Sequence, residues 1–96
     1  MKLCVLLWAV PGREQQLVEY EDRVLPLLAE YDARVIQRVR SQDSGDGPLE
    51  VHILEFPSED AFDGYLADPV RASWSELRDG AVARADVLRV DDVGLG

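Results

Sequence analysis

The order of its predicted secondary-structure elements is the feature that most restricts the fold of this chain. Four short segments rich in apolar or β-branched residues predict strands at residues 3–10, 34–40, 49–56 and 87–90. Between them, apolar residues recur three or four positions apart over residues 13–31 and 58–81, which is the spacing of amphipathic helices. The resulting β-α-β-β-α-β order predicts an α+β fold of the ferredoxin-like type, with a four-stranded antiparallel sheet and the helices on one face.

Prolines and turn residues mark where these elements are interrupted. Pro26 lacks a backbone donor, so we expect it to kink the first helix or to start a new segment. Pro69 disfavours helical angles at Asp68, which predicts a break in the second helical region, and Ser58 is placed to cap its start. The turn cluster at residues 41–48 predicts a hairpin between the second and third strands. Along residues 34–40 we expect successive side chains to point to opposite faces of the sheet, with Val35 and Val39 on the same face.

Size and charge limit the domain organisation and the possible partners. We expect 96 residues to form one domain over residues 1–90, followed by a C-terminal tail at 91–96. Ten basic against nineteen acidic residues give a net charge of −9, which disfavours binding to nucleic acid or to an anionic membrane surface. No apolar run reaches the roughly 18 residues of a membrane span, and the N-terminus lacks the features of a signal peptide, so we expect a cytoplasmic protein.

The chain has a single cysteine and a single histidine, Cys4 and His52. One cysteine excludes an internal disulfide and every multi-cysteine metal site, and one histidine excludes a site that needs two. The sequence also contains no phosphate-binding glycine loop and no nucleophile motif. We therefore expect no metal and no organic cofactor.

Helices on one side leave the other face of the predicted sheet bare. If residues alternate strictly along the strands, that face carries several large apolar side chains, namely Leu6, Trp8, Ile36, Leu54 and Phe56. A monomer does not normally expose so large an apolar patch. We therefore expect a homodimer that packs sheet to sheet.

Several segments of the chain are similar to a known family. They are VLPLL at 24–28, ARVIQR at 33–38, EFPS at 55–58, YLADP at 65–69 and ADVLRV at 85–90. Together they resemble the DUF1330 family, which belongs to the dimeric α/β-barrel superfamily, and the similarity spans nearly the whole chain. The chain departs from the family pattern at residues 68–71, where DPVR stands in place of Ser-Pro-Glu-Tyr. The resemblance implies a ferredoxin-like fold and a dimer, whereas the activity of the family itself is largely undefined.

His52 and Arg38 are the best candidates for site chemistry. Counting along the strands places both on one face of the sheet with Trp8, and Tyr65 on the second helix is a possible second wall of a pocket. Such a pair could bind a small anionic or phenolic ligand, with histidine as proton shuttle and arginine holding a carboxylate or enolate. We therefore predict His52 and Arg38 as catalytic candidates, and Trp8, Tyr65 and Glu55 as ligand-binding candidates.

A purely structural interpretation of the same residues remains open. His52 is then a satisfied core or interface histidine, and Arg38 pairs with Glu50 or Glu55 across the hairpin. Glu55 itself either pairs with an arginine or caps the next helix, or it is a buried acid with a raised pKa and so belongs to a site.

Two function classes follow from this sequence. The first is a dimeric protein that binds a small aromatic or carboxylate-bearing molecule between sheet and helices. The second, suggested by the superfamily, is a cofactor-free monooxygenase, isomerase or cyclase. The sequence lacks a complete catalytic set, so it does not decide whether the protein is an enzyme.

Overall fold

The computed structural model describes residues 1–95 and has the predicted order of strands and helices. The strands are β1 (Lys2–Ala9), β2 (Arg34–Arg40), β3 (Glu50–Glu55) and β4 (Val82–Val90). The helices are α1 (Glu14–Val24), the 3₁₀-helix η1 (Leu25–Tyr31), α2 (Glu59–Leu66), α3 (Pro69–Ala72) and α4 (Ser75–Ala81). The last strand is longer than predicted, because β4 follows α4 directly. Residues 91–95 have no regular secondary structure.

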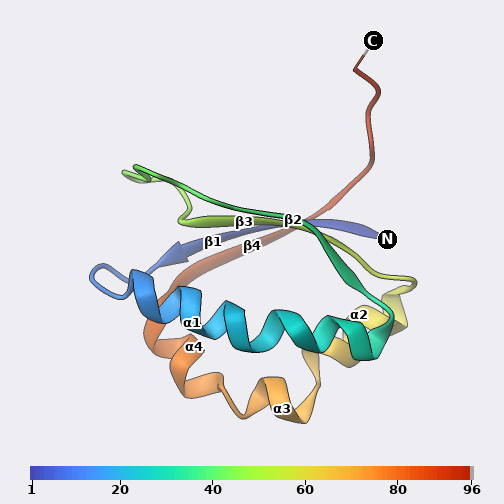
Figure 1. The fold of residues 1–96 in the computed structure, drawn as a ribbon, viewed down its shortest axis with the longest axis horizontal. Helices are drawn as coiled ribbons and strands as arrows, with labels where there is room; N and C mark the ends of the chain where they lie inside the picture. Colours follow the sequence, from blue (N-terminus) through green and yellow to red (C-terminus); the bar gives the residue numbers. More distant parts are fainter. Residues whose placement is uncertain (96) are drawn as a thin grey trace.

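The four strands form one antiparallel sheet in the order β2-β3-β1-β4. All the helices lie on one side of this sheet, and the opposite face is uncovered (Figure 1). The predicted α+β ferredoxin-like architecture is thus confirmed. None of the helices in residues 1–95 combines the length and the apolar character needed to cross a membrane.

The register between β1 and β3 decides which side chains face the helices. Leu3 pairs with Leu54 and Val5 pairs with His52, so odd positions of β1 share a face with even positions of β3. The predicted placement of Leu54 and Phe56 on the uncovered face is therefore wrong. Both belong to the core under the helices, with 5% and 1% of their surface exposed.

A β-bulge in β2 shifts the alternation of its side chains. Val35 pairs with Leu54 and Gln37 pairs with Ile53, so Ile36 is an extra residue. Val35 and Val39 consequently face opposite sides of the sheet, although strict alternation predicts one side for both. Arg38, which follows the bulge, lies directly opposite His52, as predicted.

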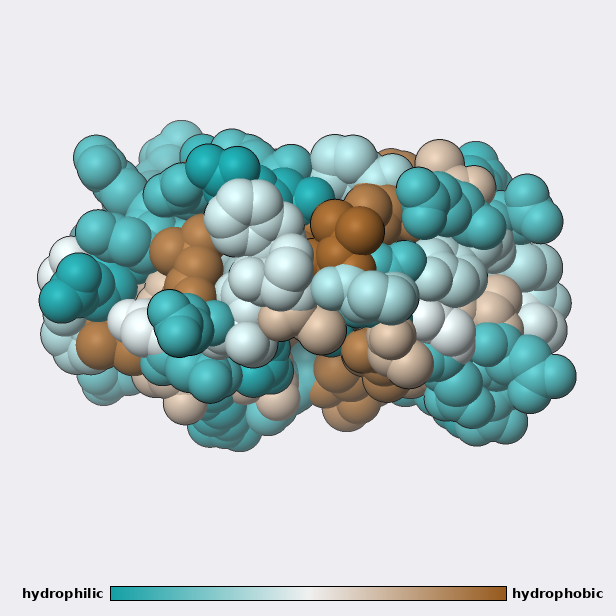
Figure 2. All heavy atoms as spheres, turned by 90° about the horizontal axis from the view of Figure 1, so that it is seen from below, coloured by the Kyte–Doolittle hydropathy of each residue, from teal (hydrophilic) through white to brown (hydrophobic). Residues whose placement is uncertain are grey.

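Proline and capping residues divide the helices as expected. α1 ends at Val24, and Pro26 lies in the first turn of η1. The Ser58 hydroxyl accepts a hydrogen bond from the backbone nitrogen of Ala61 at the start of α2. Seen from the helix side, the surface is mostly polar, with separate groups of apolar residues near its middle (Figure 2). These helices cover the face on which the candidate site lies.

Candidate functional site

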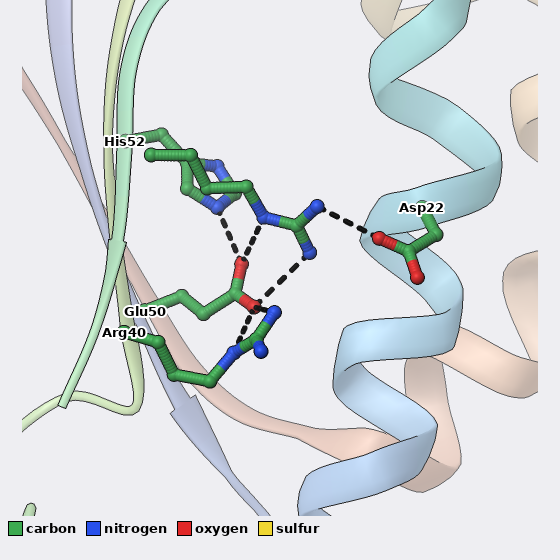
Figure 3. A network of polar contacts seen from close by, with 5 residues as sticks. Asp22, Arg40, Glu50 and His52 are labelled. Atoms are coloured by element: carbon green, nitrogen blue, oxygen red, sulfur yellow. Dashed lines mark hydrogen bonds and ion pairs between the residues drawn. The ribbon is translucent and has the colours of Figure 1, made fainter. Parts of the chain in front are cut away.

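A network of charged side chains is centred on Glu50 of β3, which is completely buried (Figure 3). Arg38 donates from Nε to Oε1 at 2.8 Å and from Nη2 to Oε2 at 3.0 Å. Arg40 donates to Oε2 from Nε at 2.9 Å and from Nη2 at 2.7 Å. The sheet register brings these groups together, since Arg40 pairs with Glu50 and Arg38 pairs with the next inward residue of β3, His52.

His52 is the third partner of the buried Glu50 carboxylate. Its Nε2 lies 2.7 Å from Oε1 of Glu50. Burial alone would raise the pKa of Glu50, but the hydrogen bonds from His52, Arg38 and Arg40 outweigh it and lower this pKa to about 2. An ionised carboxylate can only accept, so Nε2 of His52 carries a hydrogen. In the neutral ring Nδ1 is then an acceptor, and it has no hydrogen-bond partner in residues 1–95.

The network is also tied to the helix layer. Nη1 of Arg38 donates to Oδ1 of Asp22 on α1 at 2.7 Å. Arg38 therefore bridges the sheet and α1, while its other nitrogens hold Glu50. Because Glu50 in turn holds His52, the imidazole is fixed in its position on the sheet.

A cavity of about 130 Å³ lies between the sheet and the helices, beside His52. Most of its walls are apolar, including Val5, Leu7 and Leu54 of the sheet. The remaining lining side chains bring polar atoms or charges, and they are Tyr20, Glu21, His52, Tyr65, Arg71 and Arg78. Lining residues Leu66 and Val87 are about half exposed, so the mouth of the cavity lies between α2 and β4.

Glu21 and Arg71 are two charged groups of this cavity that form no ion pair with another of residues 1–95. The Glu21 side chain is only 6% exposed, and its pKa is raised, chiefly by burial. Nε of Arg71 is buried and has no hydrogen-bond partner in the portion of the chain that the structure describes. The Arg71 guanidinium carbon lies 5.0 Å from the centre of the Tyr65 ring. Tyr65 stays a neutral phenol, because burial raises its pKa to about 12, and its hydroxyl donates to the carbonyl of Val24 at 3.2 Å.

Of the predicted site residues, His52 and Tyr65 line this cavity. Arg38 lies beside His52, but Glu50 and Asp22 engage it and it is not part of the lining. It therefore takes the ion-pair role that was the alternative interpretation.

Trp8 and Glu55 lie on the other face of the sheet. The predicted shared face of Trp8 and His52 is wrong, because His52 pairs with Val5 and not with an even-numbered residue of β1. Trp8 instead borders a separate hollow near the hairpin tip, where its Nε1 donates to the carbonyl of Asp46 at 3.1 Å. Glu55 accepts from Arg34 at 2.8 Å, and that contact lowers its pKa, which contradicts the buried-acid interpretation.

Sequence reasoning missed Glu21, Arg71 and the central role of Glu50. Glu21 stands between Leu17 and Val24 at helical spacing, and Glu50 has the same parity as His52, so both signals were present. Nothing in the sequence marks Arg71, whose position depends on the short helix α3. In the described part of the chain, no three histidine, cysteine, aspartate or glutamate residues are grouped in a way that could hold a metal ion.

The sequence of the chain matches one known protein family over most of its length. Residues 10–93 match the family described as "Domain of unknown function (DUF1330)". The chain belongs to the DUF1330 family. None of the curated proteins matches it.

Several solved structures share the fold. RPA0582 of Rhodopseudomonas palustris, a protein of unknown function, is 20% identical with a TM-score of 0.73, and the match covers 97% of this chain and 82% of that one. Atu4242 of Agrobacterium tumefaciens is 16% identical with a TM-score of 0.78, covering 98% and 94% of the two chains. An uncharacterised NIPSNAP domain protein of Burkholderia xenovorans is 14% identical with a TM-score of 0.74, covering 100% and 98%. At these identities the similarities establish the shared fold alone.

Proposed function

We propose that this protein binds a small aromatic or carboxylate-bearing molecule in the cavity between its sheet and helices. The observation that carries the proposal is a cavity with mostly apolar walls that also contains an imidazole, His52, held by a buried carboxylate at 2.7 Å. Binding sites for small molecules typically combine apolar walls with a few fixed polar groups. His52 and Tyr65, two of the predicted site residues, line this cavity, whereas Trp8, Arg38 and Glu55 lie outside its lining.

The cavity volume limits the size of the ligand. An engineered apolar cavity of about 150 Å³ accepts benzene. The cavity beside His52 measures about 130 Å³ and opens between α2 and β4, so a single ring fits inside while small substituents reach toward the mouth. A ligand with two fused rings would need the helices to move.

The binding test is an NMR titration of the ¹⁵N-labelled protein with one-ring probes, namely benzoate, benzamide and phenol. We expect chemical-shift changes at residues of the cavity. Ala85→Phe places a ring at the exposed edge of the lining and should block them. Ala29→Phe adds the same ring at an exposed position of η1, outside the lining, and should leave them unchanged. If no probe shifts the cavity residues of the wild type, the proposed function is wrong.

We propose further that the uncovered face of the sheet binds a second copy of the chain. Apolar side chains on that face are strongly exposed, with Val39 at 46% and Leu88 at 52%. Exposed apolar surface of this kind favours a protein interface. The cavity lies on the opposite side of the sheet, so a sheet-to-sheet dimer would leave its mouth accessible.

A cofactor-free enzyme is the second candidate, and the free Nδ1 of His52 favours it. With Nε2 donating to Glu50, Nδ1 can take a proton from a bound ligand and return it at another atom. Among the reaction types of the superfamily, this favours isomerisation or cyclisation by proton transfer. The test is hydrogen–deuterium exchange at the α-carbon of a cyclic ketone in D₂O, followed by NMR. Catalysed exchange that disappears in His52→Phe would support an enzyme, and exchange at the uncatalysed rate would exclude this role of His52 for that probe.

A further inference from the structure

Two charged side chains share the cavity without binding each other. Nε of Arg71 is the buried side-chain atom that has no hydrogen-bond partner among residues 1–95. Glu21, only 6% exposed, lines the same cavity. Unsatisfied buried groups are rare and costly, and each one needs an explanation. A ligand anion that accepts from Arg71 and lies beside Glu21 in the cavity would give this nitrogen the partner that it lacks within the described residues.

We propose that Arg71 binds the carboxylate of a one-ring acid, and that Glu21, in its protonated form, donates a hydrogen bond to the same carboxylate. This rests on the proposed function, because it names the ligand class and two binding residues of the same cavity. The ligand is then a small monocarboxylate. Arg71 holds its carboxylate, which is the role that the sequence analysis predicted for Arg38.

The geometry of Arg71 favours a carboxylate. Nε and one terminal nitrogen of a guanidinium present two parallel donors, which match the two oxygens of a carboxylate. The guanidinium lies over the Tyr65 ring, with 5.0 Å to its centre, and this contact limits the orientation of the guanidinium plane. Asp68 fixes the backbone by accepting hydrogen bonds from the backbone nitrogens of Val70 and Arg71 at 2.8 and 3.0 Å. A phenolate, with one oxygen, would use only part of this donor pair.

Glu21 adds a proton requirement to the site. Two ionised carboxylates in a small cavity repel each other, so an anionic ligand enters most easily when Glu21 carries a proton. The titratable and charged groups around Glu21 come from every element packed against it. They are Tyr20 on α1, Arg38 on β2, Glu50 and His52 on β3, Tyr65 on α2, Arg71 on α3 and Arg78 on α4. Burial is the largest influence and raises the pKa of Glu21, as Glu50 does, while His52, Arg38 and Arg71 lower it.

The test compares benzoate with benzamide, its neutral counterpart of nearly equal shape, by calorimetry and NMR. In Arg71→Gln we expect the affinity for benzoate to fall about 10- to 100-fold, because a charge-assisted hydrogen-bond pair is lost, while benzamide binding changes less than about twofold. Arg71→Lys keeps the charge without the paired donors, and it should also weaken benzoate binding. Arg89→Gln, which removes an exposed arginine outside the lining, is the matched control.

The proton requirement is measured by repeating the benzoate titrations between pH 5 and 8 in buffers of different ionisation enthalpy. Wild type should take up protons on binding, and Glu21→Gln should take up fewer. The spread of amide resonances in each variant shows whether it is folded. Benzoate binding that is unchanged in both Arg71 variants, or proton uptake that is unchanged in Glu21→Gln, would overturn the inference. Benzamide binding would then still support the proposed function, whereas failure of every probe on the wild type would overturn both.

Discussion

Glu50 and Glu21 are both buried carboxylic acids, but their surroundings shift their pKa values in opposite directions. Glu50 accepts hydrogen bonds from His52 and two arginines, and its pKa is lowered to about 2. Glu21 has no such donors, and burial raises its pKa. Pairs of acids with such opposed pKa values are typical of sites in which one group stays ionised and the other holds a proton.

The first prediction concerns Glu50. A folded-state pKa below the ordinary value contributes stability above pH 4.5, and that contribution is lost as the pH falls toward 2. A shift from 4.5 to about 2 corresponds to about 3 kcal/mol, so Glu50→Gln should lower the free energy of unfolding by about that amount at pH 7. Urea unfolding at pH 7 and pH 3 checks this, and the difference from wild type should shrink at pH 3.

A control variant on the same strand makes the Glu50 result specific. Glu55→Gln removes a carboxylate from an exposed pair with Arg34, and exposed pairs contribute little. Its unfolding curve should stay close to that of wild type. If Glu50→Gln were equally harmless at pH 7, the network in Figure 3 would contribute no net stability.

The second prediction concerns Glu21, whose replacement should raise the free energy of unfolding, whereas replacement of Glu50 should lower it. Its folded-state pKa is raised, so the folded protein binds this proton more tightly than the unfolded chain does, and the group destabilises the fold as the pH rises above 4.5. Glu21→Gln should therefore be more stable than wild type at pH 7, because the neutral amide avoids the burial penalty of the carboxylate. The gain should be smaller at pH 4. A loss of stability at pH 7 would show that Glu21 has a stabilising partner.

The candidate site could be predicted only in part from the residues. His52 stood out because it is the single histidine of the chain, and the arginine opposite it followed from the hairpin. The charged groups at Glu21 and Arg71 belong to helices, and their entry into the cavity depends on how those helices pack on the sheet. The helical spacing of Glu21 with Leu17 and Val24 marks its inward face, but nothing local in the sequence marks Arg71.

The order of the secondary-structure elements was predicted better than which side chains of each strand point toward the helices. Turn residues, Pro26 and Ser58 act locally, so the order of elements and the helix breaks could be inferred from them. The register of β1 could not, because its segment from Leu3 to Trp8 is apolar on both faces and its alternation carries no information. The bulge at Ile36 has no sequence signature either, and it reversed the expected side of Val39.

The third prediction concerns the short helix that carries Arg71. Asp68 caps α3 through two backbone nitrogens, and its other oxygen accepts a hydrogen bond from the Tyr31 hydroxyl. Asp68→Ala removes both contacts and should lower the melting temperature by about 4–8 °C. Asp68→Asn, whose side-chain oxygen can still cap the helix, should recover most of this loss. Thermal unfolding followed by circular dichroism measures the effect, and equal melting temperatures for the two variants would contradict the capping argument.

The molecule as a whole has two different faces. One side of the sheet is covered by helices, and it contains the core, the charged network and the cavity. The other side carries apolar side chains between surface ion pairs such as Arg34–Glu55 and Arg84–Asp86. Stability and the candidate site thus depend on the covered face, and the dimer that we propose would use the uncovered one.

The fourth prediction is that the uncovered face forms the homodimer. Val39 on β2 and Leu88 on β4 both point to this face, and each is about half exposed within one subunit, so a charge at either position should cost a single subunit little. In an interface of ordinary size, about 1,200–2,000 Å² in total, the same charge would be buried without a partner. Val39→Asp and Leu88→Asp should therefore be folded monomers, while Val70→Asp, at an equally exposed position on α3, should remain dimeric. Sedimentation equilibrium at micromolar concentration distinguishes the two states, and a monomeric wild type would show that this face does not bind a second copy.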